Sequence, residues 1–124
     1  MAATPQPRCL FRRRMRLKQS RDFARVRQEG RRLACGCFIA NWRTLPPGSE
    51  TRLGVITAKK LGNAVVRARA RRLLREVFRL HQHDLAQPVE LVLVAQRIMV
   101  GKGLAAVEDA FLAMLRKAGL FKTK

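Results

Sequence analysis

Acidic residues are scarce in this chain. Its 124 residues include 27 Lys and Arg but only eight Asp and Glu, which gives a formal net charge of +19. Self-repulsion at that charge opposes a compact state, so the imbalance indicates a polyanionic partner, nucleic acid first and an anionic membrane surface second. A hydrophobic fraction of 48% still indicates one globular domain with a sizeable core.

Long apolar runs are absent as well, which counts against a membrane partner. No segment reaches the length needed to span a bilayer, and the N-terminal stretch "MAATPQPRCLFRRRMR" has no continuous apolar part that could serve as a signal peptide. We therefore expect a cytoplasmic protein, with residues 1–15 forming a flexible basic arm and residues 16–120 a single domain.

Residues suited to catalysis or metal binding are few and scattered. Cys35 and Cys37 stand one residue apart, whereas zinc ligands prefer wider spacing and a second ligand pair. Together with Cys9 they are expected to be reduced, partly buried thiols. No carboxylate pair, Ser–His pair or glycine-rich phosphate loop is evident. The sequence thus predicts no catalytic residue and no metal or cofactor on the protein itself.

The first predicted elements are short. Ser20 is a good helix N-cap and Gly30 a natural stop, which predicts a helix over residues 20–29. Residues 33–43 and 51–58 are predicted strands joined by "LPPGSE", and we expect them to pair as an antiparallel hairpin. One face of the first strand would carry Leu33, Cys35, Cys37, Ile39 and Asn41, and the other Ala34, Gly36, Phe38, Ala40 and Trp42.

The C-terminal part predicts one more strand and a last helix. The run "VELVLVAQ" is typical of a central, buried strand. Residues 103–118 are predicted to be a helix that Gly119 ends, with a core stripe of Leu104, Val107, Phe111, Met114 and Leu115. The order is therefore α-β-β-α-β-α, with room for an additional short strand, in a single α/β domain.

The longest predicted helix lies between these parts, in "GNAVVRARARRLLREVFRLHQ", with Asn63 as its cap. Its predicted core face is Val66, Ala70, Leu73 and Val77, with Leu74 at the edge. Most of the remaining surface is guanidinium, and the only acid is Glu76. A merely solvated face would mix signs, and arginine binds phosphates through two parallel hydrogen bonds, so we favour polyanion binding.

Tyrosine is absent, so stacking on nucleobases would depend on six Phe and one Trp. Phe23, on the short first helix, either lines the rim of a groove for single-stranded bases or packs in the core, and the sequence leaves both readings open. Phe111 lies on a core stripe and is expected to be structural.

The stretches "RLKQSRDFARVRQEG" and "RLGVITAKKLGNAVVRARARRLLREVFR" resemble the protein subunit of bacterial ribonuclease P, over residues 16–118. The shared pattern is a "DF…V…G" helix, a strand followed by two lysines, and "GNAV" before an arginine-rich helix. The resemblance implies a two-layer α/β sandwich in which that helix forms a left-handed β-α-β crossover. It also implies a monomer that joins one catalytic RNA and helps it remove the 5′ leader of precursor tRNA. The RNA would carry the active site and bind Mg²⁺.

The resemblance also implies site residues by position. The RNA-binding signature falls on Lys59, Lys60, Asn63, Arg67, Arg69, Arg71, Arg72 and Arg75. The leader-binding cleft falls on Phe23, Arg27, Phe38 and Asn41. Ala68 stands where the family commonly has asparagine, and Arg27 and Asn41 stand where it often has aromatics, so leader contacts would rely more on charge and hydrogen bonds. The alternative is a ribosomal or other structural RNA-binding protein; a DNA-binding regulator is less favoured, because no helix-turn-helix pair is evident.

Overall fold

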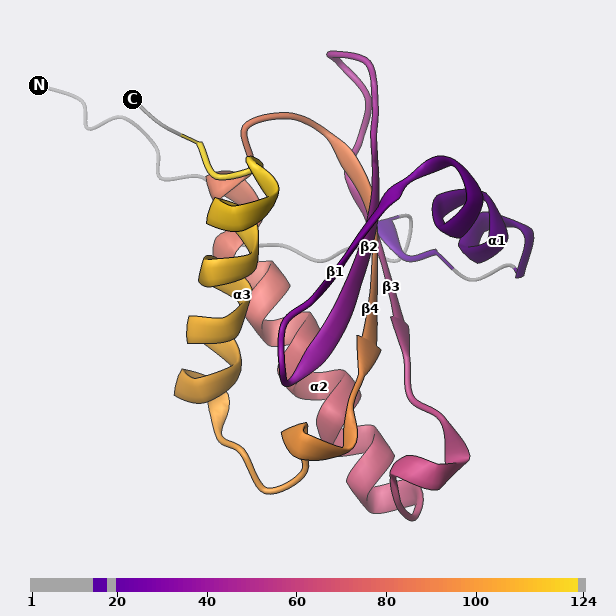
Figure 1. Cartoon of the computed structure of the whole chain (residues 1–124), viewed down its shortest axis with the longest axis vertical. Helices are drawn as coiled ribbons and strands as arrows, with labels where there is room; N and C mark the ends of the chain where they lie inside the picture. Colours follow the sequence, from indigo (N-terminus) through magenta and orange to yellow (C-terminus); the bar gives the residue numbers. More distant parts are fainter. Residues whose placement is uncertain (1–14, 18–19, 123–124) are drawn as a thin grey trace, which may run out of the picture.

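A four-stranded sheet lies between two helices on one face and one helix on the other (Figure 1). The computed structural model describes residues 15–17 and 20–122. The predicted basic arm falls outside these residues apart from Met15, which is buried in the core at 8% exposure, so the folded domain already includes position 15. The α/β class and the single domain are as predicted, and the first helix adds a partial layer to the expected two.

The element order confirms the predicted succession, including the additional short strand. The helices are α1 (Ser20–Glu29), α2 (Ala64–His81) and α3 (Leu104–Ala118). The strands are β1 (Arg31–Ala34), β2 (Phe38–Thr44), β3 (Arg52–Ile56) and β4 (Val89–Ala95), in the spatial order β1-β2-β4-β3. Short 3₁₀ helices, η2 (Lys59–Leu61), η3 (Gln82–Asp84) and η4 (Arg97–Met99), punctuate the connections.

Strand pairing departs from the sequence prediction in two ways. The single strand expected over 33–43 is broken into β1 and β2 by a tight turn at Gly36, whose φ of 77° favours glycine. The expected hairpin of β2 with β3 is wrong: β4 lies between them, antiparallel to β2 and parallel to β3. Since β3 and β4 are parallel neighbours, α2 is the crossover between them, as the family resemblance implied.

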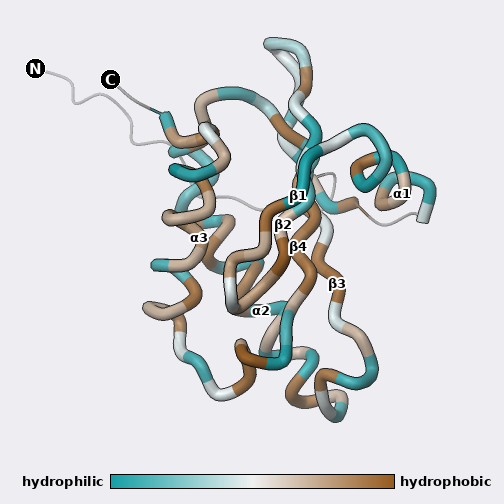
Figure 2. Tube along the Cα trace, viewed as in Figure 1, coloured by the Kyte–Doolittle hydropathy of each residue, from teal (hydrophilic) through white to brown (hydrophobic). Residues whose placement is uncertain are grey.

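The two faces of the sheet bury different clusters. Alternate residues of the strands, including Phe38, Trp42, Leu91 and Leu93, pack under α2 and α3 in the main core. On the opposite face α1 covers a smaller cluster of Leu17, Val26 and Val92, with Phe23, Ile56 and Val94 partly buried beside it. Figure 2 shows the strands as the hydrophobic centre of the molecule, with hydrophilic stretches on α1 and the outer turns.

The phase of α2 is rotated from the prediction. Asn63 caps the helix as expected, its Oδ1 accepting the Val66 N–H at 3.0 Å. The buried residues are Ala70, Leu74, Val77 and Phe78, whereas the predicted core residues Val66 and Leu73 are only half-buried. In α3 the predicted stripe is confirmed except for Leu104, which is 38% exposed, and Gly119 ends the helix with a φ of 73°.

Candidate nucleic-acid interface

A basic groove of about 480 Å³ runs along α2. Arg71, Arg72 and Arg75 line it at helical spacing, and Arg16, just before α1, faces them from the other side. Arg16 is held there because its backbone bridges to Leu53 and the next residue, Leu17, donates an N–H to the Leu53 carbonyl at 2.9 Å. Two segments distant in sequence therefore concentrate four guanidinium groups in one groove.

The charge in this groove is poorly neutralised by the protein itself. Its one lining acid, Glu76, already pairs with Arg79 on the next turn. Arg71 donates to the Thr57 hydroxyl at 2.7 Å, a neutral partner. Burial lowers the pKa of Arg75, and repulsion from Arg16 and Arg71 lowers it further. An anion entering the groove would relieve that repulsion, and phosphate oxygens match guanidinium geometry.

Two predicted RNA-binding arginines lie outside the groove. Arg69 is exposed on the other flank of α2, where its Nη2 lies 3.5 Å from the Lys102 carbonyl. Arg67 is half-buried, and its Nε is a buried nitrogen without a hydrogen-bond partner among the described residues. The predicted set is thus split by the structure into a groove, a half-buried residue and an opposite flank.

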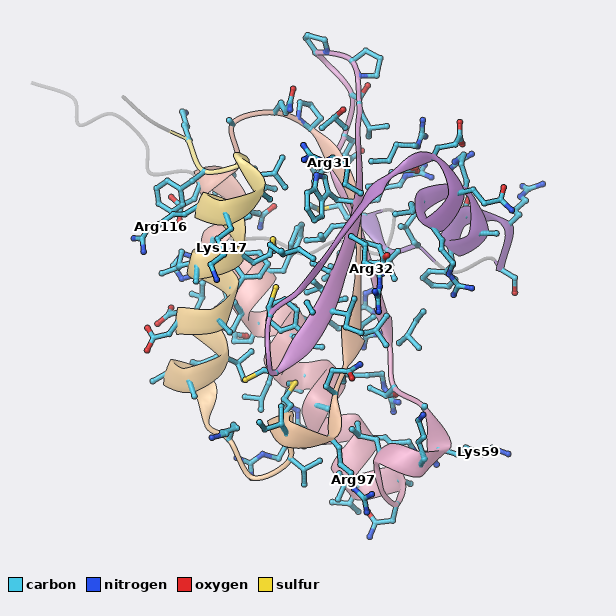
Figure 3. The ribbon with its side chains drawn as sticks, in the orientation of Figure 1. Arg31, Arg32, Lys59, Arg97, Arg116 and Lys117 are labelled. Carbon is cyan, nitrogen blue, oxygen red and sulfur yellow. The ribbon has the colours of Figure 1, made fainter. Side chains whose placement is uncertain are left out.

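Lys59, Lys60 and Asn63 are all exposed, at the end of the molecule where α2 begins. The oxygen of Asn63 is engaged in the helix cap, which leaves its amide nitrogen to bind a partner. Lys60 lines a pocket of about 490 Å³ together with Gln96 and Arg97. Figure 3 shows Lys59 and Arg97 projecting at this same end.

Phe23 lies half-buried on the sheet beneath α1. A Cβ placed on Gly54 would come within 2.2 Å of its Cε1, so the ring rests directly on the backbone of β3. Asn41 lies on the same sheet face, because it pairs with Val92, which packs under α1. Arg27 is exposed on α1 one turn after Phe23. These three predicted cleft residues therefore share one side of the molecule.

Phe38 does not belong to this cleft. It is fully buried in the main core, on the sheet face that α2 and α3 cover. The prediction was wrong because strand alternation places Phe38 with Ala40 and Trp42, on the face opposite Asn41.

A buried ion-pair cluster fixes α1 over the sheet. Glu90 of β4 is 3% exposed, and it accepts from Arg25 of α1 at 3.0 Å and from Arg43 of β2 at 2.8 Å. Arg25 also reaches Asp22 at 3.1 Å. The orientation of α1, and with it that of Phe23 and Arg27, depends on this cluster.

Sequence reasoning missed Arg16, Arg97 and the role of Glu90. A charged residue inside the apolar run "VELVLVAQ" was a signal for Glu90, since a buried acid needs a basic partner. An arginine directly after a central strand was the signal for Arg97. Arg16 gave no local signal, because only the fold brings it to α2.

The cysteines in the described part are free and half-buried, as predicted. Burial raises the pKa of the Cys35 thiol, although nearby Lys117 opposes this. Cys9 lies outside the described residues. Within residues 15–17 and 20–122 no group of three or more His, Cys, Asp and Glu is placed to hold a metal ion, and no helix is long and apolar enough to cross a membrane.

Comparison with known proteins places this arrangement in a family. A family model described as Ribonuclease P matches residues 11–119. The ribonuclease P protein component of Syntrophomonas wolfei is 34% identical over 106 residues, covering 86% of this chain and 88% of its own. That of Dictyoglomus thermophilum is 37% identical over 111 residues, covering 86% and 90%.

Solved structures agree with the sequence matches. The RNase P protein of Staphylococcus aureus gives a TM-score of 0.78 at 26% identity, covering 87% of this chain and 98% of that one. The RNase P protein of Thermotoga maritima gives a TM-score of 0.72 at 25% identity, covering 82% and 96%. The similarity therefore extends over the fold as a whole and is not confined to the arginine helix.

Proposed function

Because this chain belongs to the family of bacterial ribonuclease P protein components, we propose that it joins the catalytic RNA of that enzyme in the cytoplasm and assists removal of the 5′ leader from precursor tRNA. One protein would bind one RNA. The RNA would carry the active site and most of the bound Mg²⁺, while the protein supplies fixed positive charge.

The observation that carries this proposal is the groove along α2. Arg71, Arg72 and Arg75 converge there with Arg16, and the lining offers one acid that is already paired. Such a cluster is unfavourable in the free protein and favourable against a phosphate backbone, because each neutralised phosphate releases condensed counterions. Binding of the catalytic RNA is assigned to this face, with Lys59 and Lys60 extending it past the start of α2.

The leader is assigned to the opposite side of the sheet. Phe23 offers a half-exposed ring, Asn41 an amide and Arg27 a charge, which suits a single strand whose bases stack and whose phosphates need cations. The pocket with Lys60, Gln96 and Arg97 lies at the far end of β3 and β4. A leader strand running from Phe23 toward that pocket would pass over Ile56 and Val94.

Reconstitution tests the proposal against its alternative. The purified protein is added to protein-free ribonuclease P RNA at a magnesium concentration too low for the RNA alone, and cleavage of precursor tRNA is measured. We expect the 5′ leader to be released at the mature end. A ribosomal or other structural RNA-binding protein of similar charge would bind the RNA without restoring cleavage, and that result would reject the proposal.

A further inference from the structure

An apolar pocket lies on the flank of α2 away from the arginine groove. Its volume is about 240 Å³, below the roughly 300–1,000 Å³ of pockets for drug-sized ligands. One wall is Val66, Ala70 and Leu73 of α2, and the other is Met99, Val100 and Gly101 after β4. The size suits a single planar ring system.

Exposed hydrophobic side chains surround this pocket. Val65 is 76% exposed and Val100 45%, and both line the mouth. Ile98 and Leu104, 60% and 38% exposed, lie on the adjoining η4 and at the start of α3. Four of the five large hydrophobic residues that are exposed in the described part of the chain therefore lie at this end, a concentration that marks a binding surface.

The pocket is continuous with the proposed RNA-binding face. Arg69 lines the pocket and belongs to the predicted RNA-binding set, and its guanidinium reaches across to the Lys102 carbonyl. Val65 and Arg72 lie two turns apart on the same side of α2, so a strand following the exposed arginines passes the pocket mouth. A guanidinium plane beside apolar walls is a surface on which an unstacked base can lie.

Charge decides between possible occupants. A second copy of this chain would bring another +19 to a surface that already carries Arg69 and Lys102. Like charge of that size opposes self-association, whereas it attracts a nucleic acid. We propose that the pocket receives one unstacked nucleobase of the RNA whose phosphates α2 binds. This inference rests on the proposed function, and it adds direct contact with a base to contact with the backbone.

The test compares two double variants that remove equal numbers of exposed aliphatic side chains. Val65→Gln with Val100→Gln strips the mouth of the pocket, while Ile98→Gln with Leu104→Gln alters neighbours that do not line it. Both pairs are first checked for unchanged thermal unfolding. Each protein is then bound to ribonuclease P RNA, and base reactivity and backbone cleavage are probed on the same complex.

In the wild-type complex and the Ile98/Leu104 control, we expect one unpaired base to be protected from base-specific reagents. In the Val65/Val100 variant that base should regain the reactivity it has in free RNA, backbone protection should persist, and affinity should fall at least about fivefold, as for one lost base contact. Identical base reactivities in all complexes would overturn the inference. So would a wild-type dimer in sedimentation that the Val65/Val100 variant abolishes, because the occupant would then be a second copy. Absence of any backbone protection by the wild type would instead reject the proposed function, and the inference with it.

Discussion

Position 54 bears no side chain, and the ring of Phe23 occupies the space that one would fill. An ideal Cβ there would meet the ring at 2.2 Å, and the Leu17 Cβ at 3.2 Å. This close approach places Phe23 on the backbone of β3 while leaving the ring half-exposed. Both readings that the sequence left open for Phe23 are thus partly met, since one face of the ring packs and the rest is accessible.

Phe23→Ala should weaken binding of precursor tRNA to the reconstituted enzyme. We expect a loss of about 1–3 kcal/mol, the value of one stacked base. Binding of mature tRNA, which has no leader, should change little. Paired affinities with both RNAs make the measurement. Equal weakening of the two would assign Phe23 to the packing of α1 alone.

Leu74→Ala should cost about 2–5 kcal/mol of unfolding free energy, because Leu74 is fully buried in the main core. Leu73→Ala should cost clearly less, since Leu73 is half-buried at the edge of the apolar pocket. Urea unfolding of both variants provides the comparison. The reverse order would mean that α2 has the phase first predicted from the sequence, and the arginine face would have to be redrawn.

At the scale of elements, α1 is docked by charge as much as by apolar contact. Glu90→Ala would leave Arg25 and Arg43 facing each other without their shared carboxylate. Removing one partner of a buried pair costs up to about 3–5 kcal/mol, and less here because both arginines reach solvent. Hydrogen exchange should show α1 losing protection before α2 does. Equal loss in both helices would contradict a local docking role, and Glu90→Gln is the conservative control.

His81 links the end of α2 to η3 and α3. Its Nδ1 lies 2.8 Å from Asp84 and its Nε2 2.7 Å from Glu108. Burial opposes protonation, but the two carboxylates outweigh it and raise the pKa of His81. A raised folded-state pKa stabilises the fold below the unfolded value of about 6.5, and this contribution is lost as pH rises through the folded pKa.

The difference in stability between the wild type and His81→Gln should therefore shrink as pH rises from about 6 to about 8. Chemical unfolding of both proteins across that range measures it. Asp84 and Glu108 are the charged groups that contact the ring from either side. A difference that stays constant with pH would show that the ring contributes only packing.

Element identity was predictable here, but strand partners were not. Local signals such as Ser20, Asn63 and Gly119 define helix ends from neighbouring residues, and these predictions agree with the structure. The hairpin of β2 with β3 failed because β4, some 35 residues later, is the most apolar strand and takes the central place. Nearness in sequence favoured the wrong pair, and only packing on both faces selects the right one.

The candidate site was predictable to the extent that it lies on one helix. Helical periodicity found the basic face of α2, yet it placed the core one step away from Leu74 and Phe78. It could not find Arg16, which reaches the groove only through the bridge of its segment to Leu53. Phe38 was misassigned because the aromatic type alone does not reveal which sheet face a strand residue occupies.

For the molecule as a whole, positive charge is spread widely but is not equivalent everywhere. Figure 3 shows Arg31 and Arg32 on β1 and Arg116 and Lys117 on α3, far in sequence from the groove. Arg31 lies over the Trp42 ring at 6.0 Å and Arg116 over Phe121 at 5.3 Å. The central claim is that the arginines of α2 bind the catalytic RNA, whereas these other cations supply only general attraction.

Salt dependence of RNA binding tests that claim most directly. Arg72→Ala with Arg75→Ala is compared with Arg116→Ala with Lys117→Ala, which removes the same charge from the last turn of α3. Affinity for ribonuclease P RNA is measured over a range of salt concentrations. We predict that the α2 variant loses about 0.7–0.9 of logarithmic slope per lost phosphate contact, while the α3 variant keeps the wild-type slope. Equal slopes for the two variants would contradict a specific role for α2.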